Sequence, residues 1–198
     1  MIFWRRLLIS AIFLVIAALA IYGLATRKNR VGMPGKADLS SEDVDASSAP
    51  EFTSGTWINS ESLTLKGLRG RVVLVEFWTF ACYNCRNTLP SIKLWDTRYR
   101  DKGLTVVGVH TPELDQERDL NNVRREVTEL GIRYPVVTDN DYAIWKAYGV
   151  DAWPTMFVID KAGRIRGTHV GEGAYEETEQ LIQRLLAEPP QSSLAQTK

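Results

Sequence analysis

The chain of 198 residues is long enough for one domain with appendages, and its apolar content of 44% is ordinary for a globular protein. Two cysteines are too few for a disulfide-dense miniature scaffold or for a four-cysteine zinc site. The net charge of zero hides an asymmetry, because residues 1–30 carry five basic and no acidic residues and the remainder carries 19 basic against 24 acidic ones. The acidic remainder argues against nucleic acid as a partner, since phosphate contacts require a basic face.

The N-terminus has the composition of a membrane segment. Leu7–Ala25 is a run of nineteen residues without a charge. A helix of that length, at about 1.5 Å per residue, nearly spans a hydrocarbon core of roughly 30 Å. A cleaved signal peptide is the alternative, but its apolar stretch usually has only about 7–15 residues. The sequence therefore favours residues 1–28 as an uncleaved N-terminal membrane anchor.

Polar segments flank the expected domain on both sides. Residues 29–52 are rich in Ser, Asp, Ala, Gly and Pro without apolar periodicity, which predicts a flexible linker. Residues 188–198 are predicted to form a disordered tail, because Pro189 and Pro190 exclude it from the preceding helix. The folded domain is then expected at residues 53–187.

Strand and helix patterns alternate between these limits. Val72–Trp78 and Leu104–His110 are near-continuous apolar runs, typical of parallel strands buried on both faces. Apolar residues at helical spacing follow each run, at 89–99 and 120–130. The other expected elements are strands at 134–138, 156–160 and 165–170, helices at 141–148 and around 181–186, and two short leading strands at 56–59 and 63–66. This order predicts an α/β fold with a central mixed β-sheet flanked by helices.

The cysteines form the motif Cys82-Tyr83-Asn84-Cys85 just past the first central strand, where open α/β sheets bind their ligands. A helix follows, and its dipole and free N–H groups favour the thiolate form of Cys82. The two-residue spacing lets the thiols close a disulfide. A structural zinc site would need two further ligands, and the only histidines, His110 and His169, are far apart in sequence. The motif predicts dithiol redox chemistry, with no metal and no cofactor.

Two further features accompany the cysteine pair. Glu76 interrupts the apolar strand, where a charge is costly unless it is paired or protonated. We interpret it as a buried carboxylate beneath the cysteines that moves protons, with a Glu reaching solvent at the strand edge as the alternative. Pro154 precedes a strand, which proline can open but not continue within a central ladder. A cis Trp153–Pro154 bond would leave backbone groups free for a substrate, whereas a trans proline that starts the strand is the ordinary alternative.

The segments FWTFACYNC and WPTMFVIDKAGRI resemble the thioredoxin superfamily, and more narrowly the membrane-anchored bacterial TlpA/ResA/DipZ-like thiol–disulfide oxidoreductases. The stretches at 108–113 and 139–142 are similar as well, so the resemblance covers roughly residues 55–187. It implies that Cys82 is the attacking thiol and Cys85 the resolving one. It also implies that Glu76 is the buried acid and Pro154 the cis-proline opposite the disulfide.

The resemblance further implies a location and partners. Leu7–Ala25 would be a single-pass anchor in the bacterial inner membrane, with the catalytic domain in the periplasm or outside the cell. Protein disulfides or dithiols are the expected substrates, a membrane protein the expected electron donor, and apocytochrome c maturation a compatible role. Tyr83-Asn84 replaces more familiar dipeptides, which leaves the direction of electron flow open, although reduction is favoured. The expected substrate-binding residues are Trp153, Thr155, Tyr83 and Asn84.

Two other function classes fit parts of the motif. Thr79 and Cys82 have the T-x-x-C spacing of a peroxiredoxin-type peroxidase, but Val75 stands where those proteins have a proline. A copper metallochaperone would bind its ion with the cysteines and a distant His, but such proteins space the cysteines more widely. The CxxC spacing together with the Pro-Thr pair favours the oxidoreductase.

Overall fold

Residues 48–53 and 55–189 are described by the structure, which is a computed structural model. The anchor expected at Leu7–Ala25 lies outside the described residues, as do most of the expected linker and tail. Within the described residues, no helix is long and apolar enough to cross a membrane.

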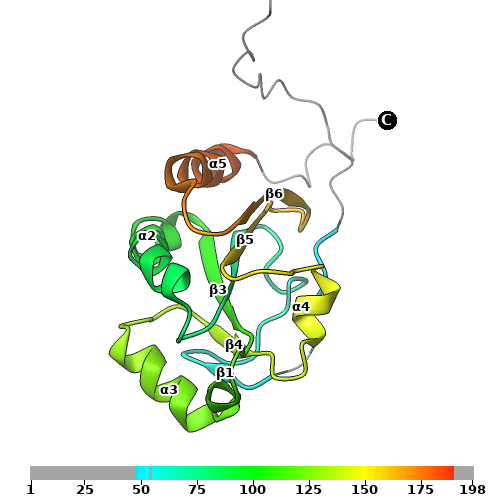
Figure 1. The fold of residues 1–198 in the computed structure, drawn as a ribbon. Coiled ribbons are helices and arrows are strands. Elements are labelled where there is room, and N and C mark those ends of the chain that lie inside the picture. Colours follow the sequence, from blue (N-terminus) through cyan, green and yellow to red (C-terminus); the bar gives the residue numbers. More distant parts are fainter. Residues whose placement is uncertain (1–47, 54, 190–198) are drawn as a thin grey trace, which may run out of the picture. The chain divides into compact units, whose positions relative to one another are not determined.

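A six-stranded mixed sheet forms the centre of the domain (Figure 1), with the strand order β1-β4-β3-β2-β5-β6. The three adjacent strands β4, β3 and β2 run parallel, whereas β1 is antiparallel to β4, β5 to β2, and β6 to β5. Every residue of β2 is buried, as its apolar run predicts. The predicted mixed sheet is confirmed. The strands are β1 (Trp57–Ile58), β2 (Val72–Trp78), β3 (Leu104–His110), β4 (Val136–Thr138), β5 (Thr155–Ile159) and β6 (Ile165–Val170).

Helices cover both faces of the sheet. In Figure 1, α2 and α3 lie on one side of the sheet and α4 on the other. Alternate residues of β2 contribute to two core clusters, because successive side chains of a strand point to opposite faces. One cluster contains Leu74 and Trp78 with residues of α2, α3 and α5, and the other contains Val75 and Phe77 with residues of α4. The helices are α2 (Tyr83–Tyr99), α3 (Leu120–Glu129), α4 (Ala143–Ala147) and α5 (Tyr175–Ala187), with 3-10 turns η1 (Arg100–Lys102) and η2 (Asp115–Arg118).

Aspartate side chains fix the starts of two helices. Asp119 is the N-cap of α3 and accepts a hydrogen bond from the N–H of Asn121 at 2.8 Å. The buried carboxylate of Asp139 accepts hydrogen bonds from the first turn of α4, from Ile144 at 3.0 Å and Trp145 at 2.8 Å. Both satisfy backbone donors that a helix start leaves free, so the stretch at 139–142 leads into α4 and fixes its start.

The leading segment departs from the prediction of two short strands. Trp57–Ile58 does form β1, which pairs with β4, but the strand expected at 63–66 is wrong. The Glu51 carboxylate accepts hydrogen bonds from the N–H groups of Leu65 at 2.6 Å and Lys66 at 3.3 Å. Because a side chain already satisfies these donors, the segment folds as a turn, with Leu65 buried in the core.

Packing also begins before residue 53, the first residue of the expected domain. The N–H of Ala49 donates to the carbonyl of Gly163 at 2.9 Å, and Phe52 is buried against the core. The ring of Phe52 lies edge-on to Trp57, with the ring centroids 5.7 Å apart. Residues 49–52 therefore belong to the packed domain.

Helix α2 offers a matched pair of residues for testing the core. Ile92 is fully buried, whereas Leu94 on the same helix is 47% exposed. Ile92→Ala leaves a cavity, so we expect the free energy of unfolding to fall by about 2–5 kcal/mol. Leu94→Ala should change it by no more than about 0.5 kcal/mol. Chemical denaturation of the oxidised protein measures both, and equal losses would contradict this assignment of the two faces of α2.

Candidate active site

The cysteine pair lies at the start of α2, after the short loop that leaves β2. Cys82 is the N-cap residue, as predicted, and its Sγ accepts a hydrogen bond from the N–H of Cys85 at 3.2 Å. A disulfide joins the two residues, whose Cα atoms are 5.3 Å apart. Cys85 is fully buried, whereas Cys82 is partly exposed. Cys82 is therefore the sulfur that a partner can reach.

The two residues between the cysteines lie on the surface. Tyr83 is 76% exposed and Asn84 is exposed as well. The backbone carbonyl of Asn84 accepts a hydrogen bond from the Thr88 hydroxyl at 2.9 Å, within the first turns of α2. Both side chains are thus free to meet a molecule that approaches Cys82.

Glu76 lies inside the central strand and is fully buried. Leu74 and Trp78, which share its face of β2, belong to the same core cluster as Cys85. The Tyr134 hydroxyl donates a hydrogen bond to Glu76 Oε2 at 3.0 Å, and Oε1 has no hydrogen-bond partner in the described part of the chain. Burial raises the pKa of Glu76 to about 8, and the Tyr134 hydrogen bond opposes this rise. Glu76 is thus a buried acid and does not reach solvent.

Pro154 directly precedes β5, at the end of the sheet where β2 leads into residues 79–82, the cysteine loop. The Trp153–Pro154 bond is cis. Thr155 lies opposite Phe77 in the antiparallel pairing of β5 with β2, which places Pro154 beside the end of β2. Thr155 itself is 2% exposed, and its hydroxyl donates to the carbonyl of Ala152 at 2.7 Å. The Thr155 side chain therefore supports the turn and is not available on the surface.

Trp153 connects the proline loop, which is the Trp153–Pro154 segment before β5, to its surroundings. Its indole N–H donates to the carbonyl of Thr111 at 3.1 Å, just after β3. Its ring packs against Trp145 of α4, with the ring centroids 4.3 Å apart. Trp153 and Cys82 are both partly buried residues that pack against the cluster containing Cys85. The proline loop and the cysteine pair therefore pack against the same core cluster.

Glu117 is a residue of the site that sequence reasoning missed. Its buried carboxylate accepts hydrogen bonds from the N–H groups of Ala81 at 2.9 Å, Glu113 at 2.8 Å and Leu114 at 2.8 Å. Burial raises its pKa, but the hydrogen bonds from Thr79 and from these N–H groups outweigh burial and leave the pKa below its ordinary value. Glu117 thereby ties the residue before Cys82 to the loop after β3.

His110 is a packing residue beside the cysteine loop. It is fully buried, its Nε2 lies 3.4 Å from the Thr79 hydroxyl, and its ring stacks on Phe80 with the centroids 5.6 Å apart. Burial lowers the pKa of His110 to about 4, so the ring is neutral near neutral pH. A neutral ring places no charge beside the thiols, so His110 acts here through packing.

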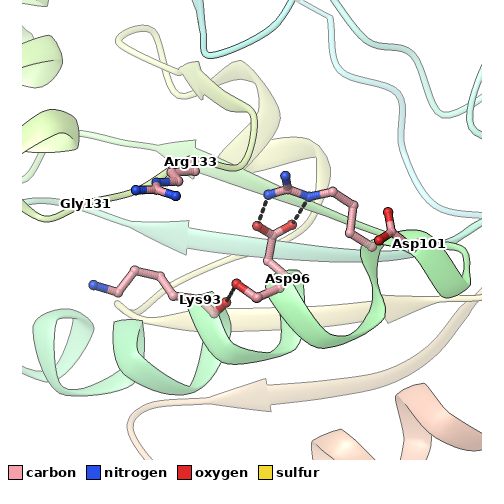
Figure 2. Close-up of a pocket in the computed structure, with 7 residues that line it drawn as sticks. Lys93, Asp96, Asp101, Gly131 and Arg133 are labelled. Carbon is pink, nitrogen blue, oxygen red and sulfur yellow. Dashed lines mark hydrogen bonds and ion pairs between the residues drawn. The ribbon is translucent and has the colours of Figure 1, made fainter.

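A polar pocket of about 420 Å³ lies away from these residues, beside the C-terminal half of α2 (Figure 2). Both carboxylate oxygens of Asp96 accept hydrogen bonds from the Arg100 guanidinium, and Lys93 Nζ donates to the carbonyl of Leu130 at 2.9 Å. None of the residues predicted for the site lines this pocket. Its lining residues are Lys93, Asp96, Thr97, Arg100, Asp101, Gly131 and Arg133.

The difference in access between the two cysteines is directly measurable. In the reduced protein, a limiting amount of an alkylating reagent should label Cys82 first, because Cys85 is fully buried. Peptide mapping identifies the labelled residue, and the unfolded protein, in which both thiols are open to solvent, is the control. Preferential labelling of Cys85 in the folded protein would reverse the assignment.

The raised pKa of Glu76 makes stability depend on pH. The pKa of Glu76 is about 8 in the folded protein and about 4.5 when the chain is unfolded, so the folded state binds the proton more tightly. The stability gained from this protonation is complete below pH 4.5 and is lost as the pH rises through about 8. In Glu76→Gln this loss is absent. The stability of Glu76→Gln relative to the unmodified protein should therefore rise by about 3–5 kcal/mol between acidic pH and about pH 9.

Denaturant unfolding of both oxidised proteins across this pH range provides the measurement. The disulfide keeps the cysteines from titrating, so the difference between the two proteins isolates residue 76. Two parallel curves of stability against pH would contradict a buried acid at this position.

The comparisons with known proteins agree with this geometry. Residues 45–183 match the model of the redoxin family. The protein DipZ of Mycobacterium tuberculosis is 42% identical over 142 residues, which cover 70% of this chain and 20% of DipZ. The thiol-disulfide oxidoreductase YkuV of Bacillus subtilis is 29% identical over 140 residues, covering 70% of this chain and 94% of YkuV. The crystal structure of a putative thiol:disulfide interchange protein DsbE from Chlorobium tepidum matches with a TM-score of 0.63 at 27% identity, covering 71% of this chain and 96% of that one.

The likeness to DipZ concerns one domain, since the chain spans about a fifth of the length of that relative. YkuV and the DsbE structure are matched over nearly their whole lengths. The family match covers more than half of the chain, and it includes the cysteine pair, the buried Glu76 and the proline loop. The chain therefore belongs to the redoxin family and carries, in a thioredoxin-like fold, a CxxC pair that forms a disulfide.

Proposed function

We propose that the protein reduces disulfides of other proteins outside the cytoplasm, using the Cys82–Cys85 pair. One arrangement carries this proposal: a disulfide at the start of α2 with one accessible sulfur, one buried sulfur, and a buried acid on the same side of the sheet. A partner reaches Cys82, and Cys85 is kept for the second step. The names of YkuV and of the DsbE structure support exchange between thiols and disulfides.

Reduction of a substrate disulfide proceeds in two exchanges. The Cys82 thiolate attacks one substrate sulfur, which forms a mixed disulfide and releases the other substrate sulfur as a thiolate that takes up a proton. Cys85 then loses its proton and attacks Cys82 Sγ, which breaks the mixed disulfide and releases the second substrate thiol. Two electrons have passed to the substrate, and the Cys82–Cys85 disulfide remains.

Glu76 is proposed as the proton acceptor of the second exchange. Cys85 is fully buried, so its thiol proton requires an acceptor inside the protein. The ionised carboxylate of Glu76 takes this proton as Cys85 becomes the nucleophile. A pKa of about 8 suits a group that must both accept and return a proton near neutral pH.

The substrate surface is proposed to surround Cys82. Tyr83 and Asn84 are exposed next to it, and the Trp153–Pro154 loop lies at the same edge of the sheet. A partner segment that lies extended across this edge would be bound largely through its backbone, which suits substrates of varied sequence. Thr155 would contribute by holding the turn.

The proposed setting is a membrane with the domain on its outer side. Leu7–Ala25 would anchor the chain in the bacterial inner membrane, and a membrane protein would return electrons to the oxidised pair. The nineteen uncharged residues flanked by basic ones support this anchor. Apocytochrome c is one substrate compatible with this location.

The two alternative functions fit the site less well. A peroxidase would need the Thr79 hydroxyl beside the reactive thiolate, but Thr79 is fully buried and its hydroxyl is engaged by His110 and Glu117. A copper chaperone would use a distant histidine as a ligand, and the His110 ring is packed between Phe80 and Trp78. Both observations favour disulfide exchange.

Trapping of the intermediate tests the proposed function. Cys85→Ala should accumulate a mixed disulfide between Cys82 and a protein substrate such as insulin, and its turnover should stop, because the second exchange lacks its nucleophile. Cys82→Ala is the matched control and should trap none. Electrophoresis without a reducing agent detects the adduct. Rapid turnover of hydrogen peroxide without insulin reduction would instead assign the protein to the peroxidases.

A further inference from the structure

The hydrogen bond between Tyr134 and Glu76 gives the buried carboxylate two unlike oxygens. The Tyr134 hydroxyl donates to Oε2 at 3.0 Å, and both residues are fully buried. Oε1 has no hydrogen-bond partner among the described residues. Tyr134 stands just before β4, so the bond reaches across β3 to join β4 and β2, the two strands that flank it. One oxygen of Glu76 is therefore anchored and the other is free.

The sheet beneath holds Tyr134 in place. Gly108 of β3 lies opposite Glu76, and a Cβ at Gly108 would stand 3.2 Å from Tyr134 Cε2 and 2.9 Å from Trp78 Nε1. The absence of a side chain at Gly108 thus lets both rings lie directly on β3. The carbonyl of Tyr134 also accepts a hydrogen bond from Asn59 Nδ2 at 3.1 Å. Packing and this second bond fix the position from which the hydroxyl reaches Glu76.

We propose that Tyr134 is a positioning residue that anchors Oε2 of Glu76 and so makes Oε1 the oxygen that exchanges a proton with Cys85. The inference rests on the proposed function of Glu76. Because one lone pair of Oε2 already accepts the Tyr134 hydrogen bond, Oε1, which has no partner among the described residues, is the more available oxygen for a proton that comes from Cys85. The hydrogen bond also favours the ionised form of Glu76, which is the form that can accept a proton.

Titratable groups also lie on the neighbouring elements on this side of the sheet, among them His169 of β6, which pairs with Met156. His110 of β3 is neutral near neutral pH, because burial lowers its pKa to about 4. Helix α2 contributes the cysteine pair and Asp96, whose charge is paired with Arg100. Strand β5 places Met156 opposite Glu76, and the buried residues of α5 carry no charge. Tyr134 itself keeps its proton, because burial and the neighbouring Glu76 raise its pKa well above the ordinary value.

Tyr134→Phe tests the proposal, because it removes the hydroxyl and keeps the ring. We expect the pKa of Glu76 to rise by about one unit, since a hydrogen bond to its charged form is lost. Titration of the Glu76 carboxyl carbon by NMR in the oxidised protein measures this shift, and Glu76→Gln identifies the resonance. At neutral pH the ionised fraction, and with it the rate at which Cys85 resolves a mixed disulfide, should fall about tenfold and recover at higher pH.

Two controls separate this role from a merely structural one. Tyr99→Phe also removes a hydroxyl from a buried ring, but this hydroxyl bonds Glu179, so the Glu76 pKa should stay unchanged. In a Glu76→Gln background, Tyr134→Phe should leave the resolution rate unchanged. An unshifted Glu76 pKa in Tyr134→Phe would show that the Tyr134 hydroxyl does not hold Oε2 of Glu76. The pKa of Glu76 could instead shift in Tyr134→Phe while both Tyr134→Phe and Glu76→Gln resolve mixed disulfides at the normal rate. That result would contradict proton transfer by Glu76, and with it the part that Tyr134 plays in disulfide exchange.

Discussion

An ionisable carboxyl group in the middle of a fully buried strand is the constraint around which this site is arranged. An uncompensated charge at Glu76 is strongly unfavourable in the core, so the group is held near the balance between its neutral and charged forms. The fold supplies one hydrogen bond, from Tyr134, and leaves the second oxygen free. A residue chosen for stability alone would be apolar at this place, as the rest of β2 is.

Two buried acids near the cysteine loop differ in pKa because their surroundings differ. Glu76 receives a single hydrogen bond, and burial dominates, so its pKa is raised. Glu117 is also buried, but three backbone N–H groups donate to its carboxylate, and its pKa is lowered. The first can carry a proton, whereas the second is a fixed anion that holds the loop before Cys82. The same residue type is thus suited to proton transfer in one place and to holding a loop in the other.

The parts of the fold that could be predicted from the sequence are those with strong local patterns. The limits of Val72–Trp78 and Leu104–His110 agree with the structure, because a strand buried on both faces is apolar along its whole length. The strand expected at 63–66 is wrong, since a side-chain carboxylate from Glu51 satisfies its backbone instead.

The residues of the site that belong to a local sequence motif could be predicted, whereas those placed by contacts between distant parts of the chain could not. CxxC after a buried strand is a local signal, and so is a lone acid within apolar residues, as at Glu76. Glu117 sits in a charged run that is typical of a solvated turn, and only its contacts with Ala81 and the loop after β3 reveal its role. Tyr134 falls within an apolar segment and meets Glu76 across 58 positions of sequence, which no local pattern encodes.

The rate at which Cys85 resolves a mixed disulfide, followed over pH, tests the central claim most directly. A chromogenic aromatic thiol attached to Cys82 reports each resolution event as it is released, without any protein substrate. The rate should rise with pH through the neutral range as Glu76 ionises, and Glu76→Gln should be slower there and lose this dependence. Superimposable profiles of the two proteins would contradict the account of a buried proton acceptor.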